Sequence, residues 1–248
     1  MRYLVLSDIH SNLEALEAVL RAAAAQKYGA TLVLGDLVGY GADPNAVVER
    51  IRALNPVATV RGNHDKVAAG LETADDFNPV ARTAVEWTRR TLTPSTLEYL
   101  RSLPTGPLVV DDETEICHGS PLDEDLYVIA DLDAARALAA SRRRLCLFGH
   151  THVALCASLD GDRRLEIAAP HGHPEFETRL EPGVKYLINP GSVGQPRDGD
   201  SRAAYAIADI DRQTVTLYRV AYPIEKAQSK IRAAGLPSML ADRLGMGR

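Results

Sequence analysis

The sequence lacks the features of a secreted, membrane-spanning or disulfide-bonded chain. Its first apolar run is only four residues long and ends in a polar loop, which is too short for a secretory signal or a membrane span. The three cysteines have no CxxC spacing, and an odd number cannot pair completely. We therefore expect a soluble, cytoplasmic protein with no membrane partner, in which Cys117, Cys146 and Cys156 are buried free thiols.

The chain also has little positive charge and few aromatic residues. Its net charge is −5, aromatic residues make up 5% of it, and the arginines are scattered except for the run at 142–144. Long nucleic acid is bound by a basic stripe along the phosphates, or by aromatic platforms for unpaired bases. We therefore predict that long nucleic acid is not a partner. Such a protein can still attract a phosphate group if bound metal ions reverse the potential locally.

The first quarter of the chain alternates buried strands with helices. We predict strands at 3–7, 31–36 and 57–61, with helices at 12–27 and from Pro44 onward. Ser11 and Glu14 have the spacing of a capping box for the first helix, and Asp43 is the predicted cap of the second. All three strands stop at polar residues, which we expect to lie along one edge of a sheet.

Residues 66–104 interrupt this alternation with predicted helices at 79–91 and 94–102, and we interpret them as an insertion near the active site. The remainder is richer in antiparallel strands and contains no linker. Strands are predicted at 107–111, 114–118, 144–148, 153–158, 163–168, 184–188, 203–209 and 213–220, and helices at 131–141 and 223–235. The pattern indicates an α/β fold in which residues 1–248 form one domain with two sheets.

Five strand ends carry side chains that commonly bind metals. They are DIH at 8–10, GD at 35–36, GNHD at 62–65, HG at 118–119 and GHTH at 149–152. Residues i and i+2 of an extended backbone project to the same side, so Asp8 with His10, and His150 with His152, are predicted to form two-pronged clamps. The neighbouring glycines allow backbone and ion to approach closely. Five of the seven histidines lie in these motifs.

Each residue taken alone has a simpler explanation. A single strand-end aspartate such as Asp36 usually caps a helix or turn, and a single histidine such as His118 is usually a satisfied core residue. The recurrence of five motifs in one chain favours a shared site instead. His171 and His173 also have i,i+2 spacing, but they lie among prolines and glycines and are interpreted as a hairpin loop.

The order and content of the five motifs closely resemble the calcineurin-like metallophosphoesterase superfamily, from Asp8 to about Asp198. The segment NPGSVGQPRDGD at 189–200 resembles the small bacterial and archaeal phosphodiesterase branch of that family. The resemblance implies a four-layer α/β/β/α sandwich of two mixed β-sheets flanked by helices. It also implies that Asp8, His10, Asp36 and His152 hold one metal ion, and that Asp36 bridges to a second held by Asn63, His118 and His150.

The proposed donors are oxygen and nitrogen atoms without a thiolate, a set that suits Mn²⁺, Fe, Co²⁺, Ni²⁺ or Zn²⁺. We expect two divalent ions per chain, with Mn²⁺ favoured. A shared carboxylate sets such ions about 3.5–4 Å apart, where a bridging water loses a proton and attacks phosphorus. The chain is thus predicted to hydrolyse small phosphate esters, phosphodiesters ahead of phosphomonoesters.

Four further residues are candidates for catalysis or substrate binding. The resemblance places His64 beside the substrate, as a general acid or as a stabiliser of developing charge. Asp65 either orients the His64 imidazole or caps the following helix. Arg61 and Arg197 are candidate phosphate contacts, although an arginine after a strand is more often paired at the surface.

Other functions remain open at this level. The same metal site permits a phosphomonoesterase, a protein phosphatase, a nuclease or a hydrolase of dinucleoside polyphosphates. A non-catalytic scaffold on the same fold is the alternative outside enzymes, and it would be expected to have lost His64, which is present.

Overall fold

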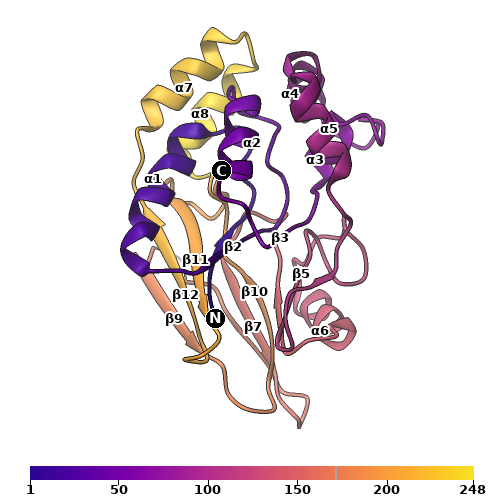
Figure 1. The fold of residues 1–248 in the computed structure, drawn as a ribbon, viewed down its shortest axis with the longest axis vertical. Coiled ribbons are helices and arrows are strands. Elements are labelled where there is room, and N and C mark those ends of the chain that lie inside the picture. Colours follow the sequence, from indigo (N-terminus) through magenta and orange to yellow (C-terminus); the bar gives the residue numbers. More distant parts are fainter. Residues whose placement is uncertain (171) are drawn as a thin grey trace.

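The computed structural model describes residues 1–170 and 172–248 and consists of two mixed, six-stranded sheets (Figure 1). The first sheet has the order β3 (Ala58–Thr59), β2 (Ala30–Val33), β1 (Arg2–Leu6), β11 (Ala203–Asp209), β12 (Thr214–Val220) and β9 (Glu175–Arg179). The second has the order β4 (Leu108–Val109), β5 (Thr114–Ile116), β6 (Leu145–Leu147), β10 (Lys185–Asn189), β7 (Leu155–Leu159) and β8 (Leu165–Ala168).

Strand β1 shows how the layers are held together. Leu4 and Leu6 belong to the core between the first sheet and its helices, whereas Tyr3 and Val5 belong to the core between the two sheets. Both faces of the strand are buried, which is why its sequence is a continuous apolar run without alternation. A third core, which includes Phe148, lies between the second sheet and α6 (Asp131–Ala140). The predicted four-layer α/β/β/α sandwich is confirmed.

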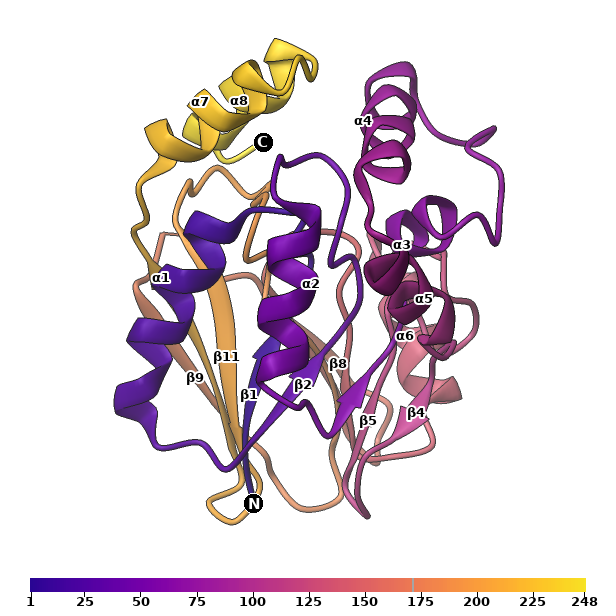
Figure 2. The ribbon, with the colours of Figure 1, turned by 45° about the horizontal axis from the view of Figure 1, so that its top comes forward.

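The remaining helices form two groups. The first group covers the first sheet and consists of α1 (Leu13–Ala23), extended by a 3-10 turn at Ala24–Gln26, α2 (Pro44–Ala53), α7 (Ile224–Ala233) and α8 (Ser238–Met246). Figure 2 shows α1 and α2 in front of this sheet, with the α7–α8 pair, coloured yellow, at the top. The second group, α3 (Asn63–Ala68), α4 (Pro79–Thr91) and α5 (Pro94–Ser102), packs beside α2.

Each sheet brings the carboxyl ends of parallel strands to one edge. In the first sheet β1, β2 and β3 are parallel, and they lead into Asp8, Asp36 and Asn63. In the second sheet β5, β6 and β10 are parallel, and the first two lead into His118 and His150. Because the two sheets pack face to face, the motif residues from both sheets meet at the same end of the sandwich.

The start of α1 differs from the prediction. Asn12, rather than Ser11, caps the helix, and its Oδ1 accepts a hydrogen bond from the Ala15 backbone N–H at 3.1 Å. Ser11 has a φ of 53° and belongs to the preceding left-handed turn, so the helix begins one residue later. The Glu14 carboxylate forms an ion pair with Lys230 of α7 at 2.8 Å instead of completing a capping box.

Two elements were missed by the sequence analysis. Strand β9 pairs with β12 at the edge of the first sheet, and its outward residues Glu175, Glu177 and Arg179 are charged, so it has little β propensity. Helix α8 is short and is stabilised mainly by burial of Leu240 and Leu244 against the rest of the chain. The predicted helices at 79–91 and 94–102 are confirmed to the residue.

The three cysteines are buried and form no disulfide, as predicted for Cys117, Cys146 and Cys156. Cys117 and Cys146 lie side by side, with 3.7 Å between their Sγ atoms. Within residues 1–170 and 172–248, no helix has the length and apolar composition needed to cross a membrane.

Candidate metal centre

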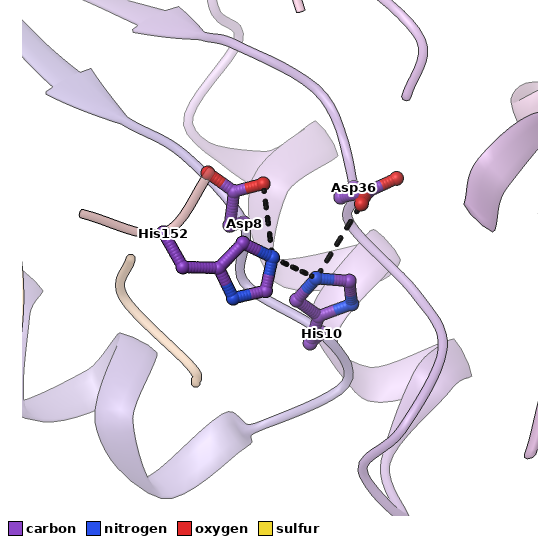
Figure 3. A group of neighbouring side chains, drawn as sticks. All are labelled: Asp8, His10, Asp36 and His152. Atoms are coloured by element: carbon purple, nitrogen blue, oxygen red, sulfur yellow. Dashed lines mark hydrogen bonds and ion pairs between the residues drawn. The ribbon is translucent and has the colours of Figure 1, made fainter. Parts of the chain in front are cut away.

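Four buried side chains from three motifs converge on one point at the shared end of the sheets (Figure 3). His10 Nε2 lies 3.0 Å from His152 Nε2 and 3.4 Å from Asp36 Oδ2. His152 Nε2 lies 3.5 Å from Asp8 Oδ1. These four residues are at most 2% exposed, so their donor atoms are shielded from bulk solvent.

A second group shares Asp36 with the first. It contains Asp36, His118 and His150, and its candidate donor atoms lie within 4.8 Å of one another. His118 Nε2 lies 3.5 Å from Asp36 Oδ2 and 3.1 Å from His150 Nδ1. Asn63 Oδ1 joins this group at 3.3 Å from His118 Nε2. Asp36 is therefore common to both groups.

The hydrogen bonds of the outer ring nitrogens determine which histidine atoms face inward as lone pairs. In the first group, His10 Nδ1 lies 3.0 Å from the carbonyl oxygen of Val38, and His152 Nδ1 lies 2.6 Å from that of Gln195. A carbonyl oxygen only accepts, so each Nδ1 carries the proton and each neutral ring presents an unprotonated Nε2 inward. Together with the carboxylates of Asp8 and Asp36, four acceptor atoms converge without a donor between them.

The second group follows the same rule with one ring reversed. His118 Nδ1 lies 2.7 Å from the carbonyl oxygen of Leu34, which leaves Nε2 facing inward. In His150 the outer nitrogen is Nε2, which lies 3.1 Å from the carbonyl oxygen of Asp125, so Nδ1 faces inward instead. Convergent lone pairs held by hydrogen bonds on the outer side are the arrangement found in protein metal sites. Both clusters can hold a divalent cation.

The pKa shifts show the consequences of packing these acceptors in a buried site. Burial lowers the pKa of His10 and of His152 well below the usual range, so both rings are neutral. Burial alone would also lower the pKa of His118, but the charge of Asp36 and the hydrogen bond with it raise that pKa to about 10. Burial raises the pKa of the Asp8 carboxyl to about 6. In the metal-free protein a proton on His118 therefore offsets part of the excess of acceptors.

The backbone geometry corrects the predicted clamps. Asp8, His10, His150 and His152 have φ values of 51°, 49°, 67° and 60°, in the left-handed region and beyond the ends of their strands. Asp8 and His10 do meet in the same group, whereas His150 and His152 diverge into different groups. The reason is that both histidines lie in left-handed conformations after the end of β6, so the alternation of an extended strand does not apply.

Two glycines make room for this packing. A Cβ on Gly62 would clash with Asp36 Oδ1 and lie 2.5 Å from the Asp36 backbone nitrogen. A Cβ on Gly149 would clash with Ser7 Oγ and lie 2.9 Å from Asp8 Oδ2. The close approach predicted for the motif glycines is therefore required by the carboxylates that the two groups use.

His64 lies beside the first group without belonging to it. Its ring centroid is 4.9 Å from that of His10, 4.3 Å from Tyr40 and 4.7 Å from Phe77. The buried Nδ1 atom has no hydrogen-bond partner among the described residues. Burial lowers the pKa of His64 to about 4, so the ring is neutral near pH 7 in this state.

Asp65 does not orient the His64 ring. Its Oδ2 accepts from the Gly62 N–H and its Oδ1 from the Val38 N–H, both at 3.1 Å. Burial raises the pKa of the Asp65 carboxyl to about 7. Of the two roles left open by the sequence, the hydrogen bonds match capping of α3, whose first residue is Asn63. Because α3 begins there, Asn63 and His64 project from a helical turn and not from a strand.

The two candidate arginines have different surroundings. Arg61 forms a bidentate ion pair with Glu124, with Nε–Oε2 and Nη2–Oε1 distances of 3.0 and 2.8 Å. The guanidinium of Arg197 lies over Tyr40, 5.7 Å from the ring centroid, and its charge contributes to the lowered pKa of His64 after burial. Arg197 is therefore available to the site, whereas Arg61 is already paired with a carboxylate.

The loop after β10 supports the centre through Asn189 and Gly191. Asn189 Nδ2 donates to the carbonyl oxygen of Gly149 at 2.7 Å, and Asn189 Oδ1 accepts from the Gly191 N–H at 2.8 Å. Tyr40 and Gln195 were not predicted, because their motifs, GYG and GQP, give no metal-ligand signal. Of the remaining histidine pair, His173 is exposed and His171 lies outside the described residues.

Comparison with known proteins agrees with this geometry. The family model of the calcineurin-like phosphoesterase superfamily domain matches residues 1–213. An uncharacterized protein of Methanocaldococcus jannaschii is 38% identical over 249 residues, which cover 98% of this chain and 97% of that protein. The crystal structure of a metallophosphoesterase from Sphaerobacter thermophilus has a TM-score of 0.86 and 42% identity, covering 100% of this chain and 99% of that one.

A hypothetical protein from Pyrococcus horikoshii OT3 has the same fold, with a TM-score of 0.79 and 21% identity over 100% of this chain and 98% of its own. One family model matches most of the chain, and a relative is 38% identical over almost its whole length. These two matches establish the family. The chain belongs to the calcineurin-like phosphoesterase superfamily.

Proposed function

We propose that this protein is a binuclear metal-dependent hydrolase of small phosphate esters that prefers phosphodiesters to phosphomonoesters. One ion is held by Asp8, His10, Asp36 and His152, and the other by Asp36, Asn63, His118 and His150. The observation that supports this most is the inward convergence of metal-ligand atoms in two groups joined by Asp36. Unpaired acceptors buried together are unfavourable unless a cation lies between them.

The donor set suits Mn²⁺, Fe²⁺, Co²⁺, Ni²⁺ or Zn²⁺, and we propose Mn²⁺ as the ion used. Ions held by these residues would supply Lewis-acid chemistry, polarising a phosphoryl oxygen and lowering the pKa of a bound water. The chain itself holds the metal-binding atoms of the histidine rings in place. Hydrogen bonds from the outer histidine nitrogens to Val38, Gln195 and Leu34 hold three of the rings in the tautomer that a cation requires.

His64 is proposed to act on the substrate side. Its ring lies next to His10 but is not among the converging donors, and its Nδ1 is unpartnered among the described residues. A phosphate anion within about 4–6 Å favours the charged form of a histidine. In that state His64 can donate a hydrogen bond or a proton to the leaving oxygen. Arg197 is proposed to contact the substrate from the Tyr40 side, whereas a contact from Arg61 would require it to leave Glu124.

We also propose that residues 66–104 are the insertion that borders the active site. Phe77 in this segment packs against His64 with 4.7 Å between ring centroids. Long nucleic acid is not proposed as a partner, since the net charge is −5, and the cytoplasmic location stays a prediction of the sequence.

The test is hydrolysis after reconstitution with each of the five metals. Metal-free protein is loaded with one metal at a time and assayed on bis(p-nitrophenyl) phosphate and on p-nitrophenyl phosphate. We expect turnover of the diester to exceed that of the monoester, and Asp36→Asn to abolish both. Asp242→Asn, at an exposed carboxylate of α8, is the matched control and should behave as wild type. Failure to hydrolyse either ester with any metal would favour the scaffold alternative.

A further inference from the structure

Two arginines from different parts of the chain meet at one ring on the edge of the metal centre. Arg197 lies in the loop after β10 and Arg243 in α8, and their Cζ atoms are 5.7 and 5.9 Å from the centroid of the Tyr40 ring. The Tyr40 ring is 4.6 Å from the ring of His10 and 4.3 Å from that of His64. One aromatic ring therefore connects the metal centre to two positive charges.

The hydrogen bonds of the two guanidiniums do not involve a side-chain carboxylate. Arg197 Nη2 donates to the Tyr40 hydroxyl at 3.3 Å and to Gln195 Oε1 at 3.2 Å. Its buried Nε has no partner among the described residues. Arg243 Nε donates to the main-chain oxygen of Arg248 at 2.6 Å. Much of the donor capacity of both arginines is unused.

Carboxylates near these arginines are engaged elsewhere. Asp198, the residue after Arg197, forms a buried ion pair with Arg219. Asp43, which follows the Tyr40 loop, pairs with Lys230 at 2.7 Å. Two arginines on one aromatic ring are thus left without a side-chain carboxylate partner among the described residues. Like charges held together are unfavourable unless an anion binds both.

The electrostatics of Arg243 are consistent with such a pair. Burial lowers the pKa of its guanidinium, and the charge of Arg197 lowers it further. Arginine is well suited to bind a phosphate group, because its planar guanidinium donates two parallel hydrogen bonds.

We propose that Arg197, Arg243 and the Tyr40 ring form a second anion subsite, which binds a phosphate group of the substrate other than the one that is hydrolysed. The preferred substrates are then esters of a diphosphate or of a longer polyphosphate chain. This inference rests on the proposed function and names its substrate class. Arg243 lies beyond residue 213, outside the stretch matched by the family model, so the C-terminal helices supply this specificity.

The first test measures binding without metal and without turnover. Inorganic diphosphate is titrated calorimetrically into metal-free wild type, Arg197→Gln, Arg243→Gln and the control Arg232→Gln. Arg232 lies on the neighbouring helix α7 and pairs with Asp242 at the surface. We expect each of the first two changes to weaken binding by about 10–100-fold, the loss typical of a charge-assisted hydrogen bond, and the control to bind as wild type. Thermal melting of each variant verifies that it is folded.

The second test uses the metal-loaded enzyme and two p-nitrophenyl esters of a nucleoside, one joined through a single phosphate and one through a diphosphate. Arg243→Gln should lower kcat/KM on the diphosphate ester about 10-fold or more beyond any change on the monophosphate ester. Equal diphosphate binding by wild type and both folded variants, or an unchanged ratio of kcat/KM, would overturn the subsite. Wild type that binds diphosphate through both arginines but hydrolyses no ester would support the subsite and contradict the proposed function.

Discussion

His10 and His152 face each other with 3.0 Å between their Nε2 atoms, although 142 residues separate them in the chain. Each ring donates its Nδ1 proton to a carbonyl oxygen on the far side, so neither neutral ring has a proton for the other. Two nitrogen lone pairs at this distance repel each other unless a cation lies between them. A bound cation would therefore relieve this repulsion and stabilise the observed arrangement of the two rings.

The division of donors between two groups predicts different metal losses in three variants. His152→Ala should lower the metal content from about two ions per chain to about one, and His150→Ala should remove the other ion instead. Asp36→Ala should reduce both, because its carboxylate belongs to both groups. Elemental analysis after gel filtration measures the content, with His173→Ala as the exposed control. An Asp36→Ala protein with two tightly bound ions would refute the shared carboxylate.

Metal binding should release protons near neutral pH. The pKa of His118 is raised to about 10 in the metal-free protein, and a metal ligand must be a neutral imidazole. Metal affinity should therefore rise as the pH increases from 7 to 9. Calorimetric titration with Mn²⁺ in buffers of different ionisation enthalpy measures the number of protons released, which should be about one from this residue. Heats that do not depend on the buffer would contradict the assignment of His118.

The same shift predicts how the stability of the metal-free protein varies with pH. A histidine whose pKa is raised on folding stabilises the native state fully below its unfolded pKa of about 6.5, and this contribution is lost as the pH rises toward the folded value. The melting temperature of metal-free protein should therefore fall between pH 7 and 9. In His118→Asn the decline should be smaller, while His173→Asn should retain it. Identical profiles for wild type and His118→Asn would be inconsistent with the raised pKa.

Replacement of His64 separates proton donation from charge stabilisation. If His64 protonates the leaving oxygen, His64→Ala should lower turnover by roughly 10²–10⁴-fold on an alkyl or nucleoside diester. A p-nitrophenyl ester, which leaves as a stable phenolate, should be affected much less. The metal content should be unchanged, since His64 is not among the converging donors. Equal losses on both substrates would indicate charge stabilisation, and loss of metal would make His64 a ligand.

The contact between Gly62 and Asp36 predicts an effect on stability. Gly62→Ala places a methyl group against the Asp36 carboxylate and should destabilise the fold by about 1–3 kcal/mol, besides weakening metal binding. Gly161→Ala is the matched control, because nothing lies within 4 Å of the Cβ that it would add. Urea denaturation of both variants and wild type measures the difference. Equal stability of the two variants would show that the loop relaxes around the new methyl group.

The residue pattern indicated an α/β fold with two sheets and the residues that gather at the site, and the family resemblance added the four-layer arrangement. Continuous apolar runs such as 3–6 indicate strands buried on both faces, and an acidic or histidine residue after each run indicates one edge of a sheet. These are local properties, so they can be read without coordinates. The position of β9 and the helix at Ser238–Met246 could not be read in this way, because pairing with β12 and burial against other helices stabilise them.

The family resemblance implied how the site residues divide into two groups, but their orientation and backbone geometry became known from the tertiary structure. His150 and His152 enter different groups because the backbone after β6 turns through left-handed conformations that the sequence pattern does not specify. Asp65 accepts from the backbone N–H groups of the nearby Gly62 and of Val38, and Arg61 pairs with Glu124. Val38 and Glu124 are distant in the sequence, so no local pattern identifies them as partners. The meeting of Arg197 with Arg243 on Tyr40 likewise depends on where the C-terminal helix packs, which no local pattern encodes.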